Sequence, residues 1–223
     1  FQKKCLGKMS EVASAGRTVL LVSHSMAALE SLCSSALLFH NGELALSGGV
    51  RQTIAAYLER QQEISSAKLI DRKDRSGSQK LTFTDITFED ENHLAVDTLT
   101  SGQNVRIVLK YESETEMKNV SISIGFYGAY GQFLLMLNNE MAGFHFETLP
   151  PMGYVRCMIP RLPLSANKYS INLYCEVNGL MADWIQQAMQ IVVVDGDFYG
   201  TGKVVPQSHG GFLVQQTWDS HSS

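Results

Sequence analysis

Cysteine is scarce in this sequence, with four residues in 223 and no CxxC pair. The irregular positions of Cys5, Cys33, Cys157 and Cys175 indicate neither a zinc knuckle nor a disulfide framework, so we expect buried thiols in a reducing compartment. Long hydrophobic runs are also lacking, since no stretch approaches the roughly 20 apolar residues that cross a bilayer. No secretory signal is recognised, and because the first residue is Phe1 we expect the sequence to be part of a longer protein.

Positive charge is scarce in the C-terminal part. Residues 81–223 carry 7 Lys and Arg against 15 Asp and Glu, whereas residues 1–63 carry 6 and 5, and residues 64–80 carry 5 and 2. A body with such an acidic excess repels phosphate backbones, so nucleic acid is not expected as a partner. The apolar share of 44% is typical of an ordinary globular protein.

The first 63 residues alternate between helical and strand patterns. Thr18 to Val22 is a continuous aliphatic run, which is typical of a strand buried on both faces of a parallel sheet. Asn41-Gly42 between two apolar stretches predicts a hairpin turn. The expected elements are a helix at 1–15, a strand at 18–22, a short helix at 25–33, a hairpin at 36–47 and a helix at 50–63.

The pattern changes after residue 63. Residues 64–80 are rich in charge and contain Ser76-Gly77-Ser78, so we interpret them as a flexible linker. In residues 81–223 apolar and polar residues alternate with a period of two, which predicts about eight strands in an immunoglobulin-like antiparallel β-sandwich. The expected strands lie at 81–88, 105–111, 120–127, 132–137, 154–159, 169–177, 190–194 and 212–218.

Both parts contain residues that match a known family. Phe1 to Met9, Gly16-Arg-Thr-Val-Leu-Leu-Val-Ser-His24 and His40-Asn-Gly-Glu43 resemble the final third of an ABC-transporter ATP-binding domain. More narrowly, they are similar to the ATP-binding subunits of polysaccharide exporters of the O-antigen type, often named Wzt. Asp195-Gly-Asp-Phe-Tyr-Gly-Thr-Gly202 and Gly210-Gly-Phe-Leu-Val214 resemble the carbohydrate-binding domain that such exporters append. Residues 1–63 are then an α/β remnant of the ATPase domain.

The resemblance implies a role in export. It places on His24 the catalytic histidine that contacts the γ-phosphate of ATP in the intact parent, together with Mg as a cofactor there. It also implies a lipid-linked O-antigen polysaccharide as ligand, a membrane subunit as partner, and a homodimer in which an edge strand is exchanged. The location that follows is cytoplasmic, at the inner face of the membrane.

The chain itself lacks the motifs of an ATPase. Phosphoryl transfer needs a glycine-rich loop with a lysine around the phosphates and a carboxylate that holds magnesium. The 223 residues contain no GxxxxGK[ST] loop and no LSGGQ-like signature. We therefore expect this chain to bind no ATP and no other cofactor, and to have no enzyme activity, whereas the intact parent is expected to be an ATPase.

Sugar recognition combines hydroxyl-bonding polar side chains with aromatic faces that cover the C–H surface of a ring. The outward rows of the expected strands supply both kinds, and the row Asn172, Tyr174 and Glu176 is the strongest candidate because its side chains repeat at about 7 Å along one face. The candidate residues are Arg106, Ser121, Ser123, Tyr127, Asn172, Tyr174 and Glu176.

Alternatives remain open from the residues alone. Glu176 with Asp183 or Glu147 would suit a glycosidase if the carboxyl groups lay about 5 to 10 Å apart. Asp195 and Asp197 supply too few oxygens for calcium, so no metal site is predicted. We expect the residues from Phe133 to Met136, and likewise Trp184 and Trp218, to be structural residues of the core. A docking and dimerisation domain that binds no sugar is the rival function, and an exposed apolar patch would favour it.

Overall fold

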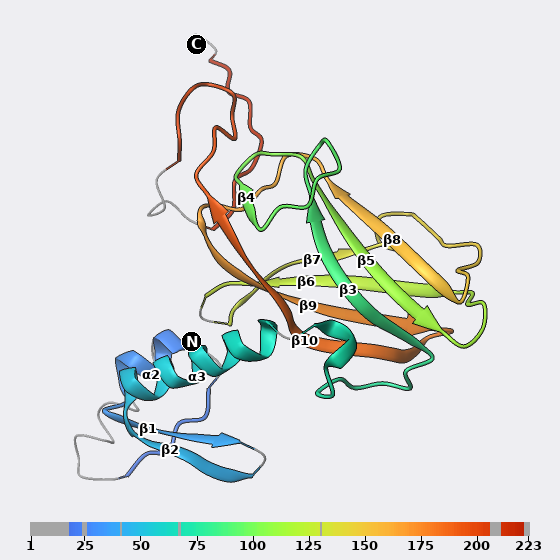
Figure 1. The fold of residues 1–223 in the computed structure, drawn as a ribbon. Helices are drawn as coiled ribbons and strands as arrows, with labels where there is room; N and C mark the ends of the chain where they lie inside the picture. The colour runs from blue at the N-terminus through green and yellow to red at the C-terminus, as the bar shows by residue number, and fades with distance from the viewer. Residues whose placement is uncertain are drawn as a thin grey trace. The chain divides into compact units, whose positions relative to one another are not determined.

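The structure, a computed structural model, describes residues 18–23, 26–40, 42–66, 68–129, 131–205 and 211–220. The chain divides near residue 64 into two compact units, which are described separately. Figure 1 shows a small unit of helices and a hairpin and a larger unit that is built mainly from strands. Within the described residues, no helix has the length and apolar character needed to span a bilayer.

The first unit contains two helices and one hairpin: α2 (Met26–Leu32), β1 (Ser35–His40), β2 (Glu43–Gly49) and α3 (Val50–Ser66). The hairpin is antiparallel and its turn places Gly42 at a φ of 83°, a conformation that glycine adopts without strain. Met26, Val50 and Ile54 form a small core. These elements agree with the short helix, the hairpin and the following helix that the sequence predicts.

The expected strand at 18–22 is not formed. Residues 18–23 have no regular secondary structure, and Val22 is 98% exposed. A strand with two apolar faces is stable only between neighbouring strands. Within the part of the chain that the structure describes, the apolar run belongs to none of the sheets, so it has no strand beside it to cover its faces. The expected helix at 1–15 lies outside the described residues, as does His24.

The second unit is a sandwich of two sheets. One sheet has the order β4-β10-β9-β6-β7 and the other has the order β3-β5-β8. Figure 1 shows the three-stranded sheet in front of the five-stranded sheet, with the strands of the two sheets crossing. Every pairing is antiparallel except the one between β4 and β10. The strands are β3 (Leu81–Glu89), β4 (Thr98–Thr100), β5 (Val105–Ser113), β6 (Val120–Tyr127), β7 (Phe133–Asn138), β8 (Met152–Ile159), β9 (Asn167–Val177) and β10 (Leu180–Val194).

Period-two alternation creates the core. On β6, Val120, Ile122, Ile124 and Phe126 are buried, while the residues between them are only partly covered. The inward residues of β3, β5 and β9 continue the same cluster. Each large side chain buried in this way contributes about 1.5–3 kcal/mol of hydrophobic stabilisation. The prediction of a mostly β, antiparallel sandwich of about eight strands is therefore confirmed.

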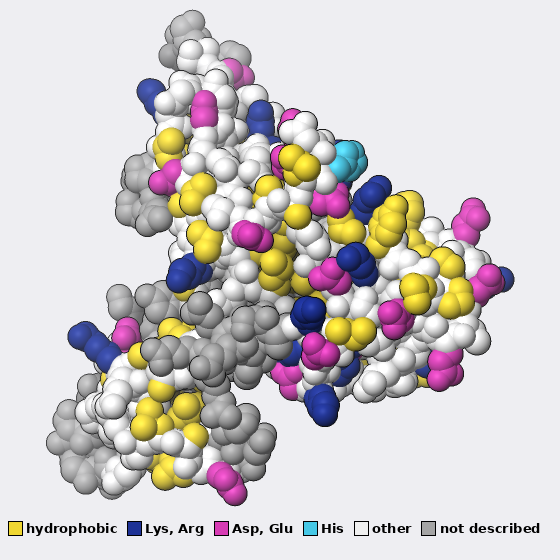
Figure 2. All heavy atoms as spheres, in the orientation of Figure 1, with side chains coloured by type: hydrophobic (Ala, Val, Ile, Leu, Met, Phe, Trp, Pro, Cys, Tyr) yellow, Lys and Arg dark blue, Asp and Glu magenta, His cyan; other side chains and the backbone are white. Residues whose placement is uncertain are grey.

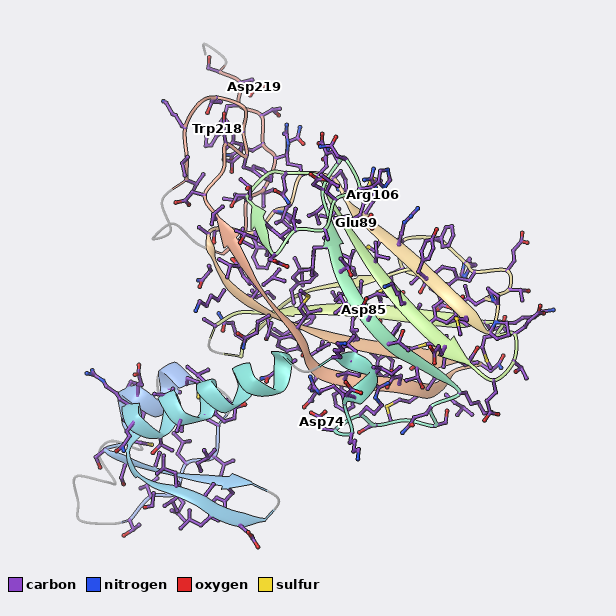
Figure 3. All side chains as sticks on the ribbon, in the orientation of Figure 1. Asp74, Asp85, Glu89, Arg106, Trp218 and Asp219 are labelled. Carbon is purple, nitrogen blue, oxygen red and sulfur yellow. The ribbon has the colours of Figure 1, made fainter. Side chains whose placement is uncertain are left out.

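Two strand predictions need correction. The three residues of β4 are too few to produce a visible alternation, and the sequence analysis missed them. The expected strand at 212–218 is absent, because Phe212 makes only an isolated bridge with Leu164 and the described residues after it form no strand. Trp218, which lies near the C-terminal end in Figure 3, is 87% exposed.

Residues 68–80, which the sequence analysis placed in a flexible linker, are part of the sandwich. Leu69, in the short helix η1 (Leu69–Asp71), is buried in the main core. Arg72 donates hydrogen bonds to the carbonyl oxygens of Gln186 (2.8 Å) and Gln187 (3.1 Å). Ser76 pairs with Trp184 of β10 through two backbone hydrogen bonds. The charges of this segment therefore anchor it to the sandwich instead of keeping it in solvent.

The attachment of residues 68–80 to the sandwich includes a buried ion pair. Arg75 Nη1 lies 3.1 Å from Asp183 Oδ2, and the two side chains are 5% and 0% exposed. The backbone N–H of Phe83 donates to the same carboxylate oxygen at 2.9 Å, and the Arg75 guanidinium also donates to the carbonyl oxygens of Phe83 and Leu69. Burial raises the pKa of the Asp183 carboxyl, while Phe83 and Arg75 act in the opposite direction.

Asp197 organises the loop that follows β10. Its carboxylate accepts hydrogen bonds from the backbone N–H groups of Gly202 (2.6 Å) and Thr201 (3.0 Å). These bonds, above all the one from Gly202, hold the pKa of Asp197 below its usual value of 3.8. The carboxylate is therefore occupied as an acceptor of backbone hydrogen bonds within its own loop.

We expect this loop to loosen in acid. Because the folded pKa of Asp197 is depressed, its stabilising effect is complete above pH 3.8 and is lost as the pH falls through the folded value. In an NMR titration from about pH 6 to about pH 2, the midpoint of the Gly202 amide shift should lie below pH 3.8. Asp197→Asn should abolish this step, and a Gly202 resonance that moves equally in both proteins would contradict the assignment.

Candidate functional site

Six of the seven candidate binding residues lie on one face. This outer face consists of the side chains of β4, β6, β7, β9 and β10 that point away from the three-stranded sheet. Strands β6 and β9 are antiparallel neighbours, so their outward residues stand directly opposite each other, with Cβ atoms about 4.5–5.5 Å apart. The opposed pairs are Ser121 with Glu176, Ser123 with Tyr174, Gly125 with Asn172, and Tyr127 with Ser170.

Arg106 is not brought to the outer face. It lies on β5, in the opposite sheet, and donates to the carbonyl oxygens of Asp90 (2.9 Å) and Glu91 (3.3 Å). Figure 3 places it beside Glu89 and on the same sheet as Asp85. Lys110 on the same strand pairs with Asp85 at 2.9 Å. Figure 2 shows that this sheet carries charges of both signs, with hydrophobic side chains over β8.

Hydrogen bonds fix the polar side chains of the outer face. Asn138 at the end of β7 donates from Nδ2 to Ser123 Oγ (2.9 Å) and Ser121 Oγ (3.1 Å). Asn172 accepts a hydrogen bond from the backbone N–H of Gln187 at 2.7 Å. Each serine hydroxyl that accepts from Asn138 keeps its own proton for another acceptor. The face therefore presents pre-positioned donors and acceptors.

Tyr174 and Glu176 form the acidic end of this face. The hydroxyl of Tyr174 donates to Glu176 Oε1 at 2.6 Å. This hydrogen bond raises the pKa of Tyr174, so the phenol remains protonated at neutral pH. A carboxylate accepts several hydrogen bonds, and Glu176 can therefore receive hydroxyl groups of a ligand while it holds Tyr174 in place.

Gly125 lies near the centre of the outer face, with the ring of Tyr127 close beside it. A Cβ atom at this position would lie 3.2 Å from Tyr127 Cε2, 3.8 Å from Phe133 Cε2 and 3.9 Å from Asn172 Cβ. The rings of Tyr127 and Phe133 pack edge to face with centroids 5.4 Å apart. The absence of a side chain at Gly125 therefore lets the Tyr127 ring lie close to the strand, next to Phe133 and the Cβ atom of Asn172. A glycine inside a strand often marks a close approach to the backbone, and this was the signal in the sequence that could have identified the position.

The structure exposes aromatic residues that the sequence analysis placed in the core. Phe133 is 58% exposed, and Trp184, which pairs with Tyr174 across β9 and β10, is 38% exposed. Both side chains border the polar rows of the outer face. Polar rows that repeat at about 7 Å along a strand, flanked by aromatic rings, suit the hydroxyl groups and C–H faces of linked pyranose rings.

The arrangement does not provide the glycosidase pair of Glu176 with Asp183. Glu176 lies on the outer face, whereas Asp183 is buried on the inner side of the sheet with Arg75. Such enzymes need two carboxyl groups that flank one glycosidic bond. Glu147 lies in the segment between β7 and β8. Glu176 and Asp183 therefore lie on opposite sides of the sheet and do not flank one bond.

Comparisons with known proteins give one family match and several relatives. The sequence model of the Wzt C-terminal domain matches residues 72–204. The teichoic acids export ATP-binding protein TagH of Bacillus anthracis is 34% identical over 74 residues, which are 33% of this chain and 14% of that protein. TagH of Bacillus cereus is 30% identical over 106 residues, which are 48% of this chain and 19% of that protein. The chain thus spans less than a fifth of the length of these relatives.

A solved structure shares the fold. The crystal structure of the C-terminal domain of wzt superposes with a TM-score of 0.54 at 15% identity, over 67% of this chain and 90% of that chain. At this identity the likeness shows the fold alone. It agrees with the antiparallel sandwich described above.

Proposed function

The chain belongs to the Wzt C-terminal domain family, and from this premise we propose that it is the carbohydrate-binding part of an ABC-transporter ATP-binding subunit. Its ligand is a lipid-linked O-antigen polysaccharide that is recognised for export. The observation that carries this proposal is the outer face, where the hydrogen-bonded polar side chains of β6 and β9 lie beside the rings of Tyr127 and Phe133.

The first unit and the relatives support the connection to an ATPase. The curated relatives are ATP-binding proteins of exporters, and the chain corresponds to a small part of each. In the proposed parent, ATP and Mg bind to the preceding domain and His24 takes part in hydrolysis. The parent is located at the cytoplasmic face of the membrane, works with a membrane subunit and pairs as a homodimer, with exchange of an edge strand. A tethered binding domain needs only modest affinity, because tethering raises the effective concentration of its ligand.

Removal of the Tyr174 ring tests the proposal. We expect Tyr174→Ala to weaken binding of the polysaccharide at least about tenfold, since one ring face and one hydroxyl are lost together. Calorimetry with the 223-residue chain and the delipidated surface polysaccharide of its source organism measures this, with dextran as the unrelated polymer.

Tyr154→Ala is the matched control. Tyr154 is an exposed tyrosine on β8 of the opposite sheet, so its loss should leave the affinity unchanged. Equal effects of the two substitutions, or a folded protein that binds no polysaccharide, would contradict the proposal.

A docking and dimerisation domain is the second candidate. The observation that favours it is the exposed apolar row of Met152, Tyr154 and Met158 on β8. An apolar cavity of about 480 Å³ lies nearby, lined in part by Val155 and Met158 of the same strand. A protein that binds no polysaccharide but loses self-association on Met158→Asp would support this candidate in place of the first.

A further inference from the structure

The strands of the outer face carry very few charges. Among the residues of β4, β6, β7, β9 and β10, the only basic side chain is Lys168 and the only acidic ones are Glu176 and Asp183. Asp183 points into the core and is fully buried. The charged groups that these strands place on the outer face are therefore one ammonium group on Lys168 and one carboxylate on Glu176, at opposite ends of β9.

Lys168 is remote from Gly125 and Tyr174. Asn172, which stands opposite Gly125, lies four positions further along β9 and Tyr174 lies six positions further, which correspond to about 13 Å and about 20 Å along a strand. At physiological salt the Debye length is about 8 Å, so an exposed ammonium at this distance is largely screened. Lys168 therefore provides little attraction for an anion that is bound at Gly125 or Tyr174.

Several other cationic side chains of the sandwich contact aromatic rings or carboxylates. Arg156 stacks on Tyr154, with its Cζ atom 4.6 Å from the ring centroid, and Arg161 lies 5.6 Å from the ring of Phe198. Lys110 pairs with Asp85, and Arg75 with Asp183. These side chains belong to the opposite sheet, the loop regions or the interior.

From this distribution we propose that the outer face selects an uncharged glycan and rejects polymers linked by phosphodiesters. The inference rests on the proposed function and specifies the substrate class of the same site. A phosphodiester polymer brings a negative charge with each repeat, and recognition of such charges uses Arg, Lys or clustered N–H donors. The outer face offers Glu176 instead, which repels anions and accepts hydrogen bonds from hydroxyl groups.

The test changes the charge at one position. Glu176→Lys converts the acidic end of the outer face into a basic one, and Glu112→Lys makes the same change on β5 of the opposite sheet. Binding of the delipidated surface polysaccharide and of poly(glycerol phosphate) to the 223-residue chain is measured at about 0.05 M and about 0.5 M salt.

If the ligand is uncharged, its affinity should change less than about twofold between the two salt concentrations. The affinity should fall about tenfold in Glu176→Lys, because a hydrogen-bond acceptor is lost, and should not change in Glu112→Lys. Poly(glycerol phosphate) should bind to none of the three proteins. An affinity that falls more than about tenfold with salt, or rises in Glu176→Lys, overturns the charge inference while glycan binding stands. Failure of the polysaccharide to bind at either salt concentration overturns the proposed function itself.

Discussion

Replacing Arg75 with alanine should lower the free energy of unfolding of the sandwich by about 3–5 kcal/mol. The substitution leaves the fully buried Asp183 carboxylate without its cationic partner, although the Phe83 N–H still donates to it. It also removes the guanidinium that bonds the carbonyl oxygens of Leu69 and Phe83. The short helix η1 therefore loses this link to β3, while Leu69 still packs in the core.

Urea unfolding followed by tryptophan fluorescence measures this effect. Lys73→Ala is the matched control, because Lys73 lies in the same segment and is exposed, so its loss should change the stability by less than about 0.5 kcal/mol. Equal stability of Arg75→Ala and Lys73→Ala would contradict this prediction. It would show that the contacts of Arg75 do not stabilise the attachment of residues 68–80 to the sandwich.

The loss of unfolding free energy in Arg75→Ala should also depend on pH. Burial raises the folded pKa of Asp183, and the loss of Arg75 raises it further. A raised pKa means that the folded state keeps its proton more readily than the unfolded state, so stability is lost as the pH rises through this range. The difference between Arg75→Ala and the parent chain is therefore expected to be smaller near pH 4 than at pH 7.

Gly125→Val should reduce polysaccharide affinity by about 30-fold without unfolding the protein. The new side chain needs space that the Tyr127 ring occupies, so it displaces this ring from beside Phe133 and projects from the outer face. The expected factor corresponds to a loss of about 2 kcal/mol in binding free energy. The fold should tolerate valine, since it favours strands and the nearest atom, Tyr127 Cε2 at 3.2 Å, belongs to a side chain that can shift.

A graded series makes the Gly125 result specific. Gly125→Ala should weaken binding less than Gly125→Val, because the alanine methyl displaces the Tyr127 ring less than the larger valine side chain does. Thermal unfolding of both variants verifies that the sandwich is intact. Full affinity in a folded Gly125→Val protein would show that the ligand does not approach the sheet at this position.

Much of the sandwich was predictable because apolar and polar residues alternate regularly along most of its strands. Seven of the eight strands of the second unit correspond to expected ones, although β10 is much longer than its expected segment at 190–194. The first part of β10 was missed because irregular register between Ile185 and Met189 interrupts its alternation. The same interruption hid the position of Trp184, whose side chain would otherwise have followed the outward row.

The composition of the site was predictable, but its location was not. Ser123, Asn172 and Tyr174 lie on outward rows, as the alternation indicated. Arg106 also lies on an outward row, but the sequence does not show which sheet its strand joins. Segment 68–80 was misread for a similar reason, because Arg75 and Asp183 are 108 residues apart in the chain and composition does not reveal that they pair.

The most direct test of the account is where the glycan lies on the chain. We would record amide NMR spectra of the 223-residue protein during titration with the delipidated surface polysaccharide. The account predicts that the largest shifts fall on β6 and β9, around Ser123, Gly125 and Tyr174. Shifts confined to β3, β5 and β8 would contradict it, because the ligand would then occupy the opposite sheet.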